Sequence, residues 1–304
     1  MLYDCVIIGG GIAGTQAAIQ LGRYSAHKVL VIDSGYGRSS ICHTYHNILG
    51  WDEGVTGEYL RKTGRKQAEA LGAEFLQDTV TEAARDGESF VLTTGTGKRF
   101  AAHTVLIATG MVDRYPTIPG LRDTLGYSVY ICPDCDGYEI VGRRTVLLGS
   151  GEEGSGMAVL LSERTPHLTY VNHEKAPIDE KLLLHLRKLG VDYEEQPAAE
   201  VRSDGSGNIE AVVLEDGRVL EAERGFIAFG GNHVRTELAG QLGVTLESNL
   251  HIKTDPRTKM TDVEGVWAAG DISLHSELTA IAMGDGMQAA VWIHKRLRKI
   301  DNSG

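Results

Sequence analysis

Two cysteines in the middle of the chain have the spacing of a redox-active pair. Cys132 and Cys135 belong to the run Cys-Pro-Asp-Cys-Asp-Gly at residues 132–137. Two intervening residues place the sulfurs close enough to form and exchange a disulfide. Zinc ribbons use the same spacing, but they need a second pair of ligands, and Cys5 and Cys42 are isolated in the sequence. The pattern therefore favours a dithiol over a metal site.

A carboxylate beside the cysteine pair can move the protons that this chemistry requires. In disulfide exchange the attacking thiol must lose a proton and the leaving thiolate must gain one. Asp136 directly follows Cys135 and is the expected acid/base. Asp134, between the two cysteines, is expected instead to tune the thiolate pKa or to face solvent.

Two GxGxxG turns lie on either side of the dithiol in the sequence. The glycines are Gly9, Gly11 and Gly14 in the first turn and Gly149, Gly151 and Gly154 in the second. The first turn joins an apolar strand at 3–8 to a helix at 15–21, and the next strand ends at Asp33, 19 residues after Gly14. Backbone N–H groups in such a turn bind a pyrophosphate, and the carboxylate accepts hydrogen bonds from a ribose. The first turn therefore predicts a dinucleotide site.

The second turn lies between an expected strand at 144–148 and a helix at 155–162. The strand that follows, 168–171, leads into Asn-His-Glu-Lys, where Glu174 is 20 residues after Gly154. This spacing suits a carboxylate that binds an unphosphorylated ribose, whereas a 2′-phosphate requires cationic residues. NADH is therefore favoured over NADPH. Two alternatives stay open: Glu174 is a solvated turn residue, or the inner domain binds no nicotinamide nucleotide.

Length and composition indicate a protein of two α/β domains. The chain has 304 residues, of which 42% are hydrophobic and 38 are glycines, and its net charge is −11. This negative charge, with Lys and Arg scattered, argues against a nucleic-acid partner. No apolar run approaches the roughly 20 residues of a membrane span, and residues 1–8 are typical of a buried strand rather than a signal peptide. We therefore expect a cytoplasmic protein.

Further motifs complete the expected two domains. They are a strand at 105–107 that ends in Ala-Thr-Gly, a Pro-rich crossover at 115–120, a hairpin at 209–222, a strand at 226–229, the run Val-Trp-Ala-Ala-Gly-Asp at 266–271 and a helix at 278–298. The order of the motifs over nearly the whole chain resembles that of the low-molecular-weight thioredoxin reductases. That resemblance implies an α/β fold with two nucleotide-binding, Rossmann-like domains of three layers (ββα). It places an FAD domain at 1–112 and 240–304, an inner NAD(P)-binding-like domain with the dithiol at 113–239, and a homodimer.

The resemblance also assigns roles to individual residues. Cys135 would lie against the isoalloxazine ring of FAD, Cys132 would exchange with the partner disulfide, and Asp136 would be the acid/base. The FAD contacts that it implies are Gly9, Gly11, Gly14, Asp33, His46, Asn47, Thr109, Gly110, Gly270, Asp271, Thr279 and Ala280. The possible nicotinamide-nucleotide site, which follows from the second glycine turn and the spacing of the carboxylate after it, consists of Gly149, Gly151, Gly154 and Glu174.

Two segments, 276–280 and 46–52, complicate the resemblance to thioredoxin reductases. Residues 276–280, Ser-Glu-Leu-Thr-Ala, replace the family's Arg-Gln-Ala at the helix start facing the flavin, and we expect Glu277 to weaken stabilisation of an anionic reduced flavin. Residues 46–52, His-Asn-Ile-Leu-Gly-Trp-Asp, resemble dithiol oxidases that close disulfides in small sulfur metabolites such as gliotoxin. By the same resemblance, those oxidases have His at the position of Asp136. An aspartate at this position therefore favours the thioredoxin reductase pattern.

The expected function is FAD-dependent reduction of a thioredoxin-like protein, with NADH, NADPH or ferredoxin as electron donor. The alternatives are oxidation of a small dithiol with oxygen as acceptor and a flavoprotein redox sensor without turnover. A nicotinamide and the dithiol cannot both stack on one flavin face. If a nicotinamide is used, the inner domain should therefore rotate about hinges at 112–116 and 237–240.

Overall fold

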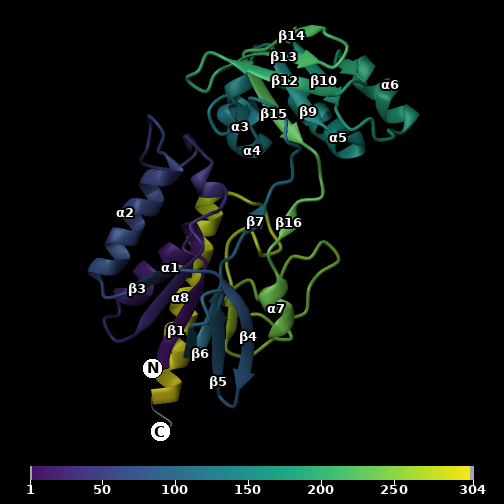
Figure 1. The fold of residues 1–304 in the computed structure, drawn as a ribbon. Helices are drawn as coiled ribbons and strands as arrows, with labels where there is room; N and C mark the ends of the chain where they lie inside the picture. The colour runs from purple at the N-terminus through teal and green to yellow at the C-terminus, as the bar shows by residue number, and fades with distance from the viewer. Residues whose placement is uncertain (1, 302–304) are drawn as a thin grey trace. The chain divides into compact units, whose positions relative to one another are not determined.

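A computed structural model describes residues 2–301 of the chain (Figure 1). The chain divides into two compact units. The first contains the chain up to Ser40, Gly57–Val112 and the chain from Val234 onward, and the second contains Ile41–Thr56 and Asp113–His233. This division differs from the expected one in two places. Residues 41–56 join the inner unit, and the chain returns to the first unit at Val234 rather than at residue 240.

The first unit is built on a sheet of order β3-β2-β1-β6-β5-β4, with β17 paired to β6. Its strands are β1 (Leu2–Ile8), β2 (Val29–Asp33), β3 (Glu74–Gln77), β4 (Val80–Asp86), β5 (Ser89–Thr94), β6 (Arg99–Ile107) and β17 (Val266–Ala268). Strands β4, β5 and β6 form an antiparallel meander, and the remaining pairings are parallel. Ile8 pairs with Ile107, so the Gly9 turn and the turn after β6 emerge at the same edge of the sheet.

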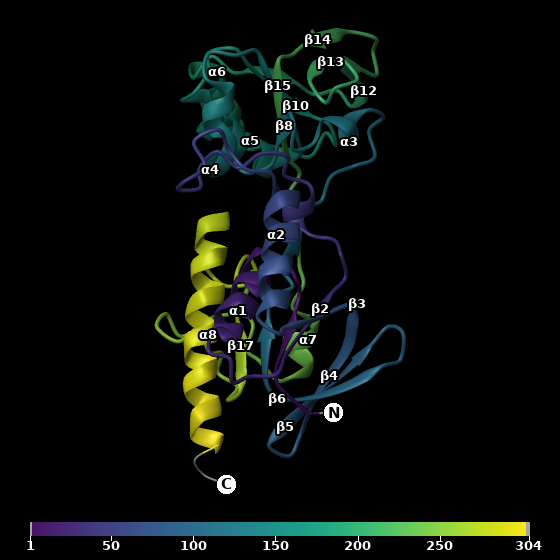
Figure 2. The same ribbon diagram turned by 90° about the vertical axis from the view of Figure 1, so that its left-hand side faces the viewer.

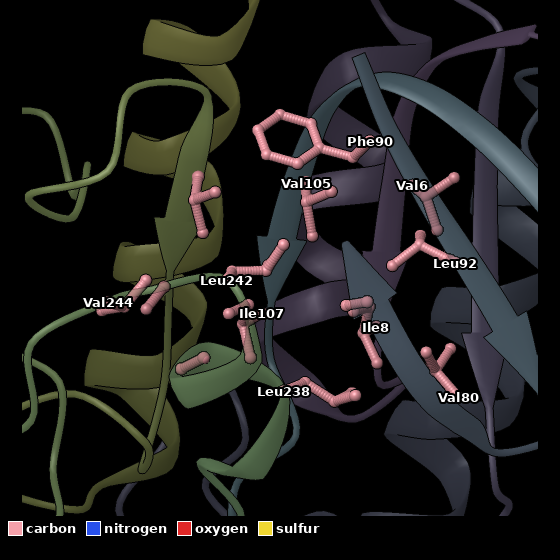
Figure 3. Packing of buried hydrophobic residues seen from close by; sticks show 14 of the residues in the cluster. Val6, Ile8, Val80, Phe90, Leu92, Val105, Ile107, Leu238, Leu242 and Val244 are labelled. Atoms are coloured by element: carbon pink, nitrogen blue, oxygen red, sulfur yellow. The ribbon is translucent and has the colours of Figure 1, made fainter. Parts of the chain in front are cut away.

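Alternate residues of β1 fill two separate cores, one on each face of the sheet. Val6 and Ile8 belong to the core on the side of the β4–β5 hairpin (Figure 3). Cys5 and Ile7 belong to the core on the opposite face of the sheet, which helices cover (Figure 2). The elements that cover the two faces are helix α7 (Glu237–Gln241) on the meander side and helices α1 (Ile12–Gly22), α2 (Gly57–Ala70) and α8 (Thr279–Asp301) on the other. The expected Rossmann-like α/β layering is confirmed for this unit.

The second unit repeats this plan around a parallel sheet of order β11-β10-β9-β15-β8. These strands are β8 (Val129–Tyr130), β9 (Thr145–Gly149), β10 (Leu168–Asn172), β11 (Asp192–Glu194) and β15 (Arg224–Ala228). Helices α5 (Gly151–Ser162) and α6 (Glu180–Lys188) pack on one core. The antiparallel strands β12 (Ala198–Ser203), β13 (Ile209–Leu214) and β14 (Val219–Glu221) pack on the other. The hairpin expected from 209 to 222 is therefore the pair β13–β14.

Two chain crossings between the units run side by side as a two-stranded sheet. They are β7 (Met111–Val112) and β16 (His233–Val234). The first expected hinge begins at this crossing, but the second is wrong. Residues 237–240 belong to helix α7, whose Leu238 and Ala239 are buried in the core of the first unit, so they are not a linker.

Helices α1 and α5 begin earlier than their sequences suggested. Helix α1 starts at Ile12 rather than at residue 15, and α5 starts at Gly151 rather than at 155, because helical hydrogen bonds already begin within the glycine turns, from Thr15 to Gly11 and from Gly154 to Ser150. The short elements are η1 (Arg38–Ser40), α3 (Leu121–Thr124), α4 (Pro133–Asp136) and η2 (Gly137–Ile140). None of the helices within residues 2–301 combines the length and the apolar character needed to cross a membrane.

Helices α1 and α8 approach each other to backbone contact. A Cβ added at Gly286 would collide with the carbonyl group of Ala13, so this approach requires glycine. Gly284, two residues earlier in α8, is exposed, and a Cβ there would meet no atom within 4 Å. The two glycines therefore sit in one helix with opposite steric surroundings.

We predict that Gly286→Ala destabilises the protein by about 1–3 kcal/mol, because the two helices must move apart. Gly284→Ala is the matched control and should leave stability unchanged or raise it by up to about 1 kcal/mol, since alanine is the better helix former. Thermal denaturation followed by circular dichroism measures both. Equal effects of the two substitutions would contradict the close approach.

Candidate functional site

The cysteine pair lies at the start of the short helix α4. Cys132 is its N-cap residue, Pro133 occupies the first turn, and the Cys132 sulfur accepts a hydrogen bond from the backbone N–H of Cys135 at 3.1 Å. Proline suits this position because its fixed φ matches the helix and its missing N–H is not needed there. The two sulfurs form a disulfide across a Cα–Cα distance of 5.3 Å. The backbone thus holds the pair ready for exchange.

The surroundings of Asp136 raise the pKa of its carboxyl. Burial raises the pKa of its carboxyl to about 7, and the negative charge of Glu139 adds to the effect. Its backbone N–H donates to the carbonyl of Cys132 at 3.0 Å, which fixes it beside the disulfide. A carboxyl with a pKa near neutral pH can both take up and release a proton. Asp134 is exposed, which agrees with the expectation that it faces solvent.

A histidine from residues 41–56 lies beside the 3₁₀ turn η2, which follows the cysteine pair. His46 Nδ1 lies 3.2 Å from the Glu139 carboxylate, and the backbone N–H of His43 donates to the carbonyl of Gly126 at 3.2 Å. The expected flavin contacts His46 and Asn47 therefore belong to the unit that carries the dithiol, and not to the unit that carries the first glycine turn. The sequence predicted the segment, but not this partner.

The first glycine turn is shaped for a ligand at one position. An added Cβ would collide with the Ala108 carbonyl oxygen at Gly9, whose φ is +105°, and with the Gly9 oxygen at Gly14, so these two glycines serve packing. At Gly11, the N-cap of α1, a Cβ would meet nothing within 4 Å. Open space beside the first amides of a helix is what a pyrophosphate requires.

Asp33 is held beside this turn by a cation. Its carboxylate accepts from Arg61 at 2.8 Å, and its side chain packs where a Cβ of Gly10 would lie. Thr109 and Gly110, which follow β6, are tied to the chain at Arg235: the Thr109 hydroxyl donates to its carbonyl at 2.7 Å. The open space at Gly11 fits the pyrophosphate of FAD, and Asp33 lies beside the same turn.

A second cluster surrounds the turn after β17. Arg38 pairs with Asp271 at 3.2 Å and also with Glu277, while His251 lies 3.5 Å from Glu277. Arg38 therefore shares the charge of Glu277, and the weakening effect of Glu277 on a reduced flavin stays a prediction. Thr279 and Ala280, the remaining expected contacts, begin helix α8.

Asp285 organises the same turn from beneath. This carboxylate is 3% exposed and accepts from the backbone N–H of Gly270 at 3.2 Å. It also pairs with Lys259 at 2.8 Å and with His275, whose pKa the Asp285 hydrogen bond raises. Sequence analysis missed Asp285. A charged residue on the buried side of a glycine- and alanine-rich helix was the available signal.

The second glycine turn is filled by the chain's own groups. The backbone N–H of Gly151 donates to the buried Asn172 side chain at 3.0 Å. A Cβ at Gly151 would lie 3.0 Å from Ala176 Cβ and 3.2 Å from the Pro177 oxygen. The ring of Tyr170 packs on Gly154. The Gly151 amide and the space beside its Cα are therefore both taken up by the protein's own groups.

Glu174 is engaged as well. Its two oxygens accept from Arg114 at 2.8 and 2.9 Å, and this hydrogen bonding lowers the Glu174 pKa to about 2. Arg114 also donates to the carbonyls of Phe229 and Gly230. Glu174 is exposed in a turn, as the alternative of a solvated turn residue expected, and it is also one half of a bidentate ion pair. Sequence analysis missed Arg114, which lies 60 residues earlier in the chain.

The sequence matches a known protein family over most of its length. A family model described as pyridine nucleotide-disulphide oxidoreductase matches residues 3–286. The chain belongs to this family. It is 28% identical to the thioredoxin reductase of Rickettsia bellii over 97% of this chain and 98% of that protein, and 28% identical to that of Treponema pallidum over 95% of each.

Solved structures show the same similarity over the whole chain. The crystal structure of HlmI is 27% identical and matches with a TM-score of 0.89 over 99% of this chain and 94% of that one. The thioredoxin reductase of Streptococcus pyogenes, at 24% identity and a TM-score of 0.87 over 98% of this chain and 99% of that one, has the same fold. The chain is a flavin-dependent disulfide oxidoreductase of the thioredoxin reductase type, and its family implies a flavin and a nicotinamide nucleotide.

We predict that Gly11→Ala weakens FAD binding tenfold or more without unfolding the protein. A methyl group there touches no protein atom but fills the space that a pyrophosphate needs. Flavin absorbance after dialysis measures retention, and circular dichroism measures the fold. Gly284→Ala is the control and should retain flavin. Full retention of flavin by Gly11→Ala would place the cofactor elsewhere.

Proposed function

We propose that this protein reduces a thioredoxin-like protein through the Cys132–Cys135 pair, with FAD as its bound cofactor. The observation that carries this proposal is the half-buried Asp136, fixed beside the disulfide with a pKa of about 7. When bound, FAD supplies a two-electron carrier that can reduce a disulfide. The thioredoxin reductases that the chain resembles over nearly its full length make a thioredoxin-like partner the first choice.

The protein's own groups divide the exchange chemistry between them. In the reduced pair, the backbone N–H of Cys135 stabilises a Cys132 thiolate through its hydrogen bond. We therefore propose Cys132 as the sulfur that attacks the partner disulfide and Cys135 as the sulfur that resolves the mixed disulfide. Asp136 takes the proton from one sulfur and returns it to another.

Replacing either cysteine should abolish electron transfer. After anaerobic reduction with one equivalent of dithionite, Cys132→Ser and Cys135→Ser should yield no thioredoxin thiols above background, because neither can complete a disulfide. Cys5→Ala, a buried cysteine of β1, is the matched control and should transfer electrons as the parent does. The measurement is the thiol content of separated thioredoxin. Transfer by either serine variant would refute the proposal.

Oxidation of a small dithiol is the second candidate. The observation in its favour is that residues 46–52, which resemble dithiol oxidases, lie in the same unit as the disulfide, with His46 against Glu139. Oxygen consumption with a small dithiol, in the absence of thioredoxin, distinguishes this candidate. A protein that reduces no thioredoxin and consumes no oxygen would instead fit a redox sensor.

The nicotinamide nucleotide does not fit the second glycine turn as the chain folds. Asn172 occupies the Gly151 amide, Ala176 and Pro177 cover its Cα, and Arg114 holds Glu174. We propose that the donor does not bind at this turn, and that a protein such as ferredoxin delivers the electrons. The resemblance also supports a homodimer in the cytoplasm, which we include in the proposal.

Anaerobic mixing with NADH, NADPH and reduced ferredoxin tests the donor. We expect ferredoxin to bleach the flavin and both nucleotides to do so at least tenfold more slowly, because the turn must open first. Arg114→Ala frees Glu174 and should raise the rate with NADH but not with NADPH, since a free carboxylate accepts from a ribose and repels a 2′-phosphate. Rapid bleaching of the parent by either nucleotide would overturn the proposal.

A further inference from the structure

Three side chains lead from the disulfide towards the surface. Asp136 is half-buried, and Glu139 follows it by three residues in the 3₁₀ turn η2. Residues three apart lie on the same side of such a turn. Glu139 Oε1 in turn lies 3.2 Å from Nδ1 of His46, whose side chain is 46% exposed. His46, at 46%, is more exposed than Glu139, at 26%, so the series leads towards solvent.

A capping role does not account for this arrangement. Asp-Gly-Tyr-Glu at 136–139 has the spacing of a capping box, in which each side chain would bond the backbone N–H of the other residue. Asp136 makes no side-chain cap hydrogen bond, and its own N–H already donates to Cys132. The Glu139 carboxylate points instead to the imidazole of His46.

His46 is held in place by its own loop. An added Cβ at Gly54, which has a φ of +78°, would lie 2.7 Å from the imidazole ring and would also collide with Thr44. The backbone of Tyr45 bonds Val55 in both directions, at 2.8 and 3.0 Å. These contacts hold the His46 imidazole in position beside the Glu139 carboxylate.

The other titratable and charged groups around Asp136 come from four elements. They are Cys42 in the 41–56 segment, Tyr130 in β8, Arg224 in β15 beside Tyr130, and Arg164 at the end of α5 against Gly137. Burial raises the pKa of both Cys42 and Tyr130 to about 12, so both stay neutral near pH 7. Burial is the main cause of the raised Asp136 pKa, and Glu139 is the charged neighbour that adds to it.

We propose that Glu139 and His46 are positioning residues that control the protonation of Asp136 and connect it to solvent during disulfide exchange. The inference rests on the proposed role of Asp136 as the acid/base. Glu139 stands between the exposed His46 and Asp136, so a change at His46 reaches Asp136 through Glu139. Neither residue is assigned a contact with substrate.

The exchange itself conserves electrons and protons. Cys132 loses a proton and its sulfur attacks the partner disulfide, whose S–S bond breaks as the mixed disulfide forms. Cys135 then loses its proton and attacks Cys132, which re-forms the intramolecular S–S bond and releases the second partner sulfur. Two electrons and two protons pass to the partner. Asp136 needs a route to solvent only to reset its proton between turnovers.

The two positioning residues should shift the Asp136 pKa in opposite directions. Glu139→Gln removes a negative charge, which makes the ionised form of Asp136 easier to reach and lowers its pKa by roughly half to one unit. His46→Gln removes the imidazole that lies 3.2 Å from the Glu139 carboxylate, which leaves more of the Glu139 charge to act on Asp136 and raises the Asp136 pKa. If His46 acts through Glu139, the double variant should behave as Glu139→Gln alone.

The test measures the alkylation rate of Cys132 by iodoacetamide in the reduced holoenzyme as a function of pH. Mass spectrometry of the Cys132 peptide follows the reaction, which needs neither partner nor donor. In the parent, ionisation of Asp136 beside the Cys132 thiol should add a step to the profile, and we expect this step at lower pH in Glu139→Gln and at higher pH in His46→Gln. Glu200→Gln, which breaks the exposed Glu200–Arg202 pair in the same unit, should match the parent.

Three outcomes would overturn the inference. They are an unchanged profile in Glu139→Gln, an effect of His46→Gln that persists in the double variant, and loss of flavin from His46→Gln, which would make His46 a cofactor contact. The pH profile of thioredoxin reduction should shift with the alkylation profile. If the parent reduces no thioredoxin but the alkylation shifts occur, the proposed partner is wrong and the control of Asp136 stands.

Discussion

Backbone contact between α1 and its neighbours is the constraint on which the first unit depends. Gly14 of α1 packs against the carbonyl oxygen of Gly9, and Gly286 of α8 packs against the carbonyl group of Ala13 in α1. A Cβ at either glycine would collide with these backbone atoms. Helix α1 can therefore pack in this position only because Gly14 and Gly286 have no side chain. Because Asp285 precedes Gly286 on α8, the same packing delivers a buried carboxylate to the Gly270 amide. The close approach of α1 and α8 therefore helps to position both the first glycine turn and the turn after β17.

The two glycine turns show how little the motif alone decides. Both have three glycines at the same spacing, a preceding strand and a following helix. In the first, the Cα of Gly11 faces open space; in the second, Gly151 has a φ of +50° and lies under Ala176 and Pro177. The difference comes from Asn172 and from the loop after β10. The glycines permit a ligand, but the residues around them decide whether there is room for one.

Local sequence predicted the elements and the chemistry of the dithiol, but not the partners that charged residues find across the fold. The strands, the hairpin and the acid next to Cys135 are visible because periodicity and adjacency are local properties. The pairs Arg114–Glu174 and His46–Glu139 join residues 60 and 93 positions apart, and no local pattern encodes them. The NADH argument considered only residues near Glu174, and so it overlooked the arginine that neutralises it.

The 41–56 segment has a consequence for how the inner unit is built. The chain passes between the units at 40–41, 56–57, 112–113 and 233–234, so the inner unit is assembled from two separate stretches. The backbone of the segment packs against Gly126, where any side chain would collide with the Ile41 carbonyl. A gene fragment for 113–233 would encode most of the inner sheet yet leave out this strap. Recombination that exchanges inner domains between related enzymes must therefore carry two pieces of sequence, not one.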